Sequence, residues 1–129
     1  MTTLKVGIAE LDEMKARTMR IARGEEKPAP GDPTVWFAST MSFAKFLSPN
    51  NCELLRIIHQ HEPESLEELA QITGRAKSNL SRTLKAMAGY GLVRMDKGKG
   101  RKLVPQVVHD RVELVLPLIE RRKSNGTRK

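Results

Sequence analysis

Residues 65–105 contain a series of helix start and stop signals that constrains the fold more than any other part of the chain. Ser65 and Glu68 have the spacing of a capping box, which satisfies free backbone N–H groups at the start of a helix. Gly74 is placed to end that helix in a left-handed turn. The sequence therefore predicts a short helix between these residues and a second helix directly after the turn.

The second helix is predicted over residues 77–87, because Leu80, Leu84 and Met87 recur at helical spacing. Gly89 and Gly91 then stop it, and two short apolar segments follow on either side of the sequence DKGKG. This pattern predicts a β-hairpin with a lysine-rich tip. Before residue 65, the sequence CELLRIIHQH predicts a further helix, capped by the asparagine at position 50 or 51.

The flanking segments divide the chain into three predicted parts. Residues 1–33 are an N-terminal arm, in which 9–23 form an amphipathic helix and 24–33 are a linker rich in proline and glycine. Residues 34–105 form the central domain, which begins with an extended piece at 35–37 and a short helix at 39–47. Residues 106–129 are a C-terminal extension with a basic tail, and within it 112–116 fit either a strand or the start of a helix.

The positive charge of the chain is concentrated in one segment. Residues 75–105 hold nine basic side chains and one acidic one, Asp96, in a chain whose formal net charge is +8. A cluster of this kind is typical of a protein that binds a polyanion. Aromatic residues make up 4% of the chain, which disfavours single-strand binding by base stacking.

Composition also predicts the location of the protein. The chain has one cysteine, which fits a reducing compartment, and it has no apolar run of membrane-spanning length. We therefore expect a soluble cytoplasmic protein that does not engage a membrane.

The order of capped helix, glycine turn, SNLSRTLKAM helix, GYGLV and basic glycine hairpin resembles the winged helix-turn-helix of MarR-type regulators. The wider chain is similar to a group of small prokaryotic regulators of that type, some of which are predicted antitoxins beside a toxin. This resemblance implies a fold that is mainly α with a small β-wing. It implies a winged helix-turn-helix domain with N- and C-terminal dimerisation extensions.

One face of the predicted 77–87 helix carries small polar and basic residues, as a helix in the DNA major groove requires. Arg82 is expected to contact guanine, and Asn79 is expected to contact adenine. The residues predicted to read or approach bases are Lys77, Ser78, Asn79, Ser81 and Arg82. Those predicted to hold phosphates on the helix and the hairpin are Arg75, Lys85, Lys97, Lys99, Arg101 and Lys102. Ala76 is a poor cap, so the helix is expected to start at Lys77 or slip to Ser78.

The predicted function is sequence-specific binding of double-stranded DNA by a transcriptional regulator, most simply a repressor. The alternative is an antitoxin that neutralises a toxin partner and represses its own operon, and a third reading is a protein of duplex RNA or the ribosome. We expect a homodimer, since a dimer presents two helices to successive half-sites. The 9–23 helix is the candidate for self-association; it would otherwise bind a toxin or pack on its own domain.

Residues with catalytic or metal-binding side chains are few. Cys52 and His59 lie seven residues apart, which places them on roughly one face of a helix, but two ligands do not make a zinc site. His109 and Asp110 are adjacent without a nucleophile placed to use them. We therefore expect no enzymatic activity, no metal site and no cofactor.

Overall fold

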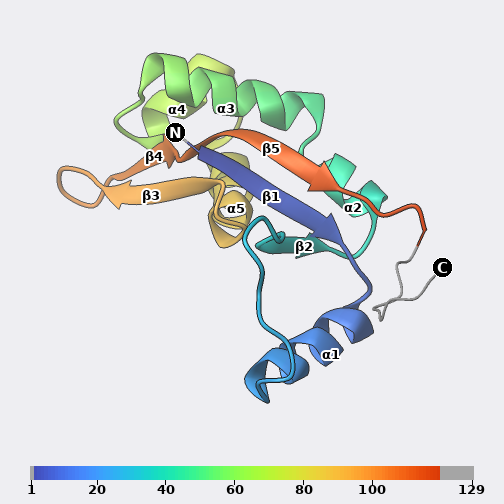
Figure 1. Cartoon of the computed structure of the whole chain (residues 1–129). Coiled ribbons are helices and arrows are strands. Elements are labelled where there is room, and N and C mark those ends of the chain that lie inside the picture. Colours follow the sequence, from blue (N-terminus) through green and yellow to red (C-terminus); the bar gives the residue numbers. More distant parts are fainter. Residues whose placement is uncertain (1, 120–129) are drawn as a thin grey trace.

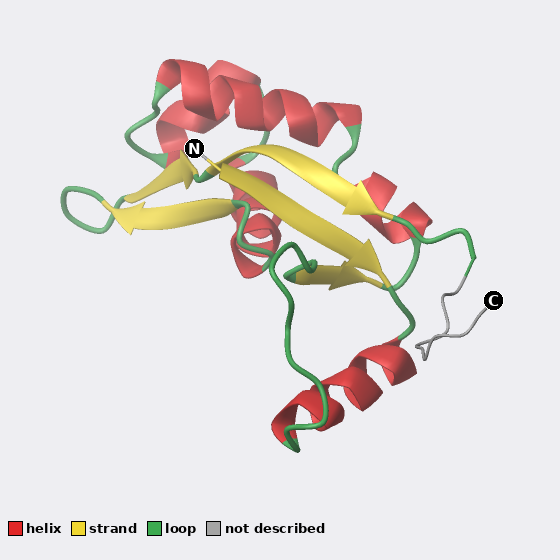
Figure 2. Cartoon of the chain, in the orientation of Figure 1, coloured by secondary structure: helices red, strands yellow, loops and turns green. Residues whose placement is uncertain are grey.

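A three-stranded parallel sheet and a separate antiparallel hairpin organise the protein, with helices packed around them (Figure 1). The computed structural model describes residues 2–119. In chain order the elements are β1 (Thr2–Ile8), α1 (Leu11–Ala22), β2 (Val35–Phe37), α2 (Thr40–Phe46), α3 (Pro49–His61), α4 (Leu66–Thr73), α5 (Lys77–Gly89), β3 (Val93–Lys97), β4 (Leu103–Val107) and β5 (His109–Val115). In Figure 2 the helices α3 and α4 lie above the strands, and α5 lies in the middle of the view, partly covered by them.

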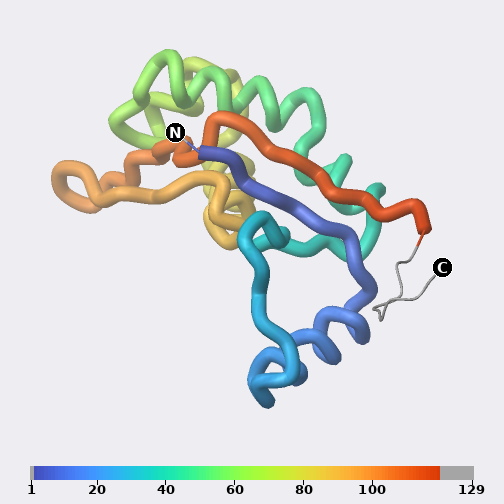
Figure 3. Tube along the Cα trace, in the orientation of Figure 1, coloured from blue at the N-terminus to red at the C-terminus, as the bar shows by residue number. Residues whose placement is uncertain are grey.

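The parallel sheet joins the two ends of the described chain. Its strand order is β2-β1-β5, and Val6 of β1 pairs with Val35 on one side and with Leu114 on the other. Figure 3 shows the first strand of the chain lying beside the last one. Leu4 and Val6 are buried, because one face of the sheet packs on the core.

The predicted fold class, mainly α with a small β-wing and terminal dimerisation extensions, is wrong. The described residues form an α/β fold of five helices and five strands, and three of those strands make a parallel sheet. The segments predicted as separate N- and C-terminal extensions pair with each other through β1 and β5. Sequence periodicity reports local conformation, whereas this pairing joins residues about a hundred positions apart, such as Thr2 and His109.

Most of the individual elements agree with the sequence. The helix pair, the hairpin, the extended piece at 35–37 and the helices before residue 65 are confirmed, and the undecided 112–116 segment belongs to strand β5 up to Val115. The cap of α3 differs, since Ser48 accepts the hydrogen bond from the backbone N–H of Asn51 at 3.3 Å. The division of the chain at residues 33 and 105 stays a prediction, and the basic tail at 120–129 lies outside the described residues.

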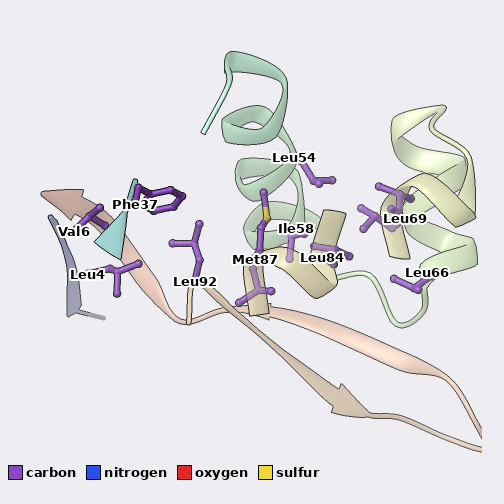
Figure 4. Packing of buried hydrophobic residues seen from close by; sticks show 12 residues of the cluster. Leu4, Val6, Phe37, Leu54, Ile58, Leu66, Leu69, Leu84, Met87 and Leu92 are labelled. Carbon is purple, nitrogen blue, oxygen red and sulfur yellow. The ribbon is translucent and has the colours of Figure 1, made fainter. Parts of the chain in front are cut away.

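The core is continuous from the sheet to the helices. In Figure 4, Leu4, Val6 and Phe37 lie at one end, and Leu66 and Leu69 lie at the other. The middle is filled by Leu54, Ile58, Leu84, Met87 and Leu92, each at most 2% exposed. Because these side chains form one cluster, the sheet and the helices α3 to α5 are parts of one packed unit.

An aromatic cluster connects the sheet to the end of α5. The ring of Phe37 stacks on Tyr90 with 4.5 Å between centroids, and it also contacts Phe43 and Phe46 at 5.5 and 5.3 Å. These rings come from β2, from α2 and from the residue that follows α5. The position of α5 is therefore tied to the sheet at its C-terminal end.

α1 stands apart from this core (Figure 1) and has no buried residue. Arg17 holds it to the following segment through Glu26 at 3.0 Å and Asp32 at 2.9 Å, and Arg20 contacts Glu26 at 2.8 Å. The Arg17 guanidinium also lies over the Trp36 ring, 5.9 Å from its centroid. Within residues 2–119, none of the helices has the length and apolar character that a bilayer crossing requires.

Candidate nucleic-acid interface

Helix α5 divides cleanly into a buried face and an exposed face. Leu80, Leu84 and Met87 are 0% exposed, because they pack into the core. Arg82 and Lys85 point to solvent from the opposite side, together with Ser78, and Ser81 is half-buried. The helix starts at Lys77 with Ala76 as an N-cap that makes no side-chain hydrogen bond. This start places Arg82 near the middle of the exposed face.

Arg75 lies in a polar network rather than in open solvent. Its Nε donates to Asn79 Oδ1 at 2.9 Å, and its Nη2 donates to Asn51 Oδ1 and to Thr83 Oγ1, both at 3.5 Å. The network ties the turn after α4 to α3 and to the first two turns of α5. In this arrangement Arg75 and Asn79 hold each other, and their predicted contacts with phosphate and adenine stay predictions.

Asn51 and Thr83 are members of this site that the sequence analysis does not include. Both belong to the network around Arg75, and Asn51 also donates from Nδ2 to the Phe46 carbonyl oxygen at 3.0 Å. No sequence signal identifies either residue as part of the network. Asn51 belongs to a different helix, and in the sequence it looks like an ordinary helix cap.

Lys77 forms an ion pair at the start of α5. Its Nζ lies 2.7 Å from Glu67 Oε2, and both side chains are exposed. The hydrogen bond from Lys77 holds the pKa of Glu67 below its ordinary value. Lys77 is therefore partly neutralised by an acid of α4, unlike the basic residues farther along the exposed face.

The hairpin β3–β4 presents its basic residues at an exposed tip. Gly98 N donates to the Lys102 carbonyl at 2.9 Å, and Gly100 has φ 67°, which glycine adopts without strain. Lys97, Lys99, Arg101 and Lys102 are all exposed. Among residues 2–119, no carboxylate forms an ion pair with any of these four, or with Arg82 or Lys85.

The start of α5 and the hairpin tip lie close together. A hollow of about 260 Å³ is lined by Leu66, Glu67, Lys77, Arg101, Lys102 and Leu103. The hairpin is also close-packed where its loop begins, since a methyl group added to Gly98 would lie 2.8 Å from Cγ2 of Val104. The structure therefore brings Lys77 at the start of α5 next to Arg101 and Lys102 of the hairpin.

The residues with metal-binding or redox side chains meet elsewhere, in a groove between α3 and β5. Cys52, His59, His109 and Asp110 all line it. The Cys52 thiol donates to the Leu47 carbonyl at 3.6 Å, and His109 Nδ1 lies 2.8 Å from Thr2 Oγ1. In the part of the chain that the structure describes, no three histidine, cysteine or acidic side chains converge in a way that would hold a metal ion.

A family model with the description HVO_A0114 matches residues 46–114, more than half of the chain. The chain belongs to the HVO_A0114 family. The HVO_A0114 match runs from the end of α2 through α3, α4, α5 and the hairpin into β5. No curated protein and no solved structure matches the chain. The description HVO_A0114 names no activity, ligand or partner, so the MarR-type resemblance and the toxin partner stay predictions.

Proposed function

We propose that this member of the HVO_A0114 family binds double-stranded DNA with sequence preference and regulates transcription, as a repressor in the cytoplasm. The main observation behind the proposal is that many cations on this surface form no ion pair. Six basic side chains on the exposed face of α5 and on the hairpin have no acidic partner among the described residues: Arg82, Lys85, Lys97, Lys99, Arg101 and Lys102. A cluster of cations without ion-pair partners fits a target rich in phosphate.

The shape of the cluster favours a duplex. α5 has 13 residues, so it is about 20 Å long, and the major groove of B-DNA admits a helix of this diameter. Arg82 lies on the exposed face where a guanidinium can bind O6 and N7 of guanine. Ser78, one turn earlier, is small enough to let the helix backbone approach the bases.

The remaining cations are suited to positioning the protein. Lys85 lies about one turn beyond Arg82, and Arg101 and Lys102 of the hairpin lie near the start of α5, where phosphates of the flanking backbone would be reached. Phosphate contacts supply affinity without reading sequence. The proposed division is therefore base reading by Arg82 and charge neutralisation by Lys85, Lys97, Lys99, Arg101 and Lys102.

The test is a salt series of binding to labelled duplexes, one from the region upstream of the gene and one of random sequence. Five phosphate contacts predict a slope of log K against log salt of about −4.5 for one bound chain and about −9 for two. We expect the upstream duplex to be preferred and duplex RNA to compete poorly, since its major groove does not admit a helix.

The matched variants carry equal charge changes. Lys99→Ala with Arg101→Ala should flatten the slope by about 1.8 for each bound chain. Lys15→Ala with Lys27→Ala removes two exposed cations from α1 and its linker, and it should leave the slope unchanged. A slope near zero, or an equal effect of both pairs, would refute the proposed interface.

A further inference from the structure

β5 is an edge strand with nothing paired to its outer side. Its only neighbour in the sheet order β2-β1-β5 is β1, and within residues 2–119 no other strand joins it. The outer edge therefore presents unpaired backbone N–H and C=O groups, which is a template for another strand. Apart from one irregularity near Asp110, the strand runs in register from Arg111 to Val115 without a proline that would block pairing.

Apolar side chains are exposed at the end of the same strand. Leu114, Val115 and Leu116 are 37%, 48% and 45% exposed. Leu118 and Ile119, which follow them, are 90% and 83% exposed. An exposed edge with apolar side chains is normally covered in a stable protein, so this feature indicates a surface used for association.

A hollow lies beside the first half of the strand. A groove of about 340 Å³ separates the first half of β5 from α3. The α3 residues that line it recur at helical spacing: Cys52, Leu55, Arg56 and His59. A strand added to β5 would lie near this groove.

Two charges on β5, Arg111 and Glu113, are complementary across a two-fold axis in one register. Two such strands can pair antiparallel about a two-fold axis normal to the sheet. Residues directly opposite each other then have their side chains on the same face of the sheet, so the axis must pass through a residue that lies opposite its own copy. With Val112 opposite Val112 of the second copy, Arg111 lies opposite Glu113 twice. Moving the axis to residue 111 places arginine opposite arginine, and moving it to 113 places glutamate opposite glutamate.

We infer that two copies of this chain associate through antiparallel pairing of their β5 strands, with Val112 at the two-fold axis. The parallel sheets of the two copies then form one continuous sheet. Within one chain Arg111 Nη2 lies 2.8 Å from Glu113 Oε2, and both side chains are exposed. A surface pair contributes little to stability, so exchanging the one pair within each chain for two pairs across the axis is not costly. This association does not depend on DNA binding.

The experiment uses charge reversal of the full-length chain and measures mass by light scattering and sedimentation over a micromolar concentration series. Arg111→Glu places glutamate opposite Glu113, and Glu113→Arg places arginine opposite Arg111. Each variant should raise the dimer dissociation constant more than about tenfold. Mixing the two variants should restore a dimer, because every opposed pair in the mixed species is then complementary.

Controls separate the interface from folding and from α1. Lys45→Glu on α2 should remain dimeric, and circular dichroism should show both β5 variants folded. The inference would be overturned if the wild type is monomeric or if the β5 variants still self-associate. It would also be overturned if the mixture of the two variants stays monomeric. It would equally be overturned if Leu11→Asp with Met19→Asp on α1 abolished the dimer while the β5 variants did not.

Discussion

Two arginines seven residues apart, Arg75 and Arg82, have opposite surroundings and therefore opposite expected roles. Arg75 is half-buried and donates hydrogen bonds to three side-chain oxygens. Arg82 is exposed, and no carboxylate of the described residues forms an ion pair with it. Substituting the first should change stability, and substituting the second should change recognition.

Arg82→Ala should weaken binding to the preferred duplex by about 1–3 kcal/mol and relax the preference at one base pair, because a bidentate contact with guanine is lost. Binding to random duplex should change much less. The measurement is fluorescence anisotropy with a panel of single-base variants. Lys85→Ala is the control, since loss of a phosphate contact should weaken all duplexes alike. If the two variants lose affinity in the same pattern, the assignment of Arg82 fails.

Arg75→Ala should lower the free energy of unfolding by about 1–3 kcal/mol, because hydrogen bonds from a charged donor to Asn51, Asn79 and Thr83 are lost. Arg75→Lys should recover only part of the loss, since an ammonium group does not have the fork geometry of guanidinium. Urea unfolding measures both. Arg82→Ala should be as stable as the wild type. If it loses as much unfolding free energy as Arg75→Ala, the two arginines do not have the different roles assigned to them.

Among the elements, β1 shows how tightly side chains of β2 and of the segment before it pack over the sheet. Gly7 is buried, and a methyl group added to it would lie 2.5 Å from the Trp36 ring and 3.0 Å from Pro33. The close approach of Trp36 therefore requires glycine at this position of the central strand.

Gly7→Ala should destabilise the protein by about 1–3 kcal/mol or more, because the added methyl group overpacks the outer face of the sheet. Gly89→Ala is the matched control. A methyl group there meets nothing within 4 Å and lies at the end of α5, so it should be neutral or stabilise by up to about 1 kcal/mol. Urea unfolding of both variants measures whether their changes in unfolding free energy have opposite signs. Equal unfolding midpoints would contradict the close packing of Gly7 against Trp36.

The attachment of α1 should depend on pH. Hydrogen bonds from Arg20 and Arg17 hold the pKa of Glu26 below its ordinary value. A lowered pKa in the folded protein stabilises the attachment above the ordinary glutamate value of about 4.3. That contribution is lost as the pH falls below this value and through the lowered pKa.

Trp36, the one tryptophan of the chain, reports this attachment because Arg17 lies over its ring. Acrylamide quenching of its fluorescence should increase as the pH is lowered through this range. Glu26→Gln should show high quenching at neutral pH and a smaller pH effect. Glu25→Gln is the neighbouring control and should behave as the wild type. Unchanged quenching in Glu26→Gln would show that these ion pairs do not hold α1.

At the scale of the whole molecule, the sequence predicts local structure better than it predicts the fold. The exposed face of α5 follows from the spacing of Leu80, Leu84 and Met87, and the hairpin follows from its glycines. The joint use of that face and the hairpin in binding DNA stays a prediction. The network around Arg75 cannot be predicted in this way, because Asn51 reaches it from another helix.

The parallel sheet is the larger omission. Leu4, Val6 and Ile8 do alternate with Thr3, Lys5 and Gly7, which is the period of a half-buried strand. That signal could have identified β1. Its partners could not have been identified, because β1 pairs with β2 and β5 across gaps that no local pattern spans. The fold class is predicted wrongly because both ends of the chain are interpreted as extensions, whereas they supply two strands of one sheet.

The pairing of β1 with β5 also determines when the core can be completed during synthesis. Thr2 and His109 are 107 positions apart, and translation at ordinary rates takes about 5 to 20 s to cover that distance. During this interval Leu4 and Val6 have been made, but the strand that completes their sheet has not. A nascent chain halted before β5 would therefore present β1 as an apolar strand with an open edge, the state in which intermolecular pairing competes with folding.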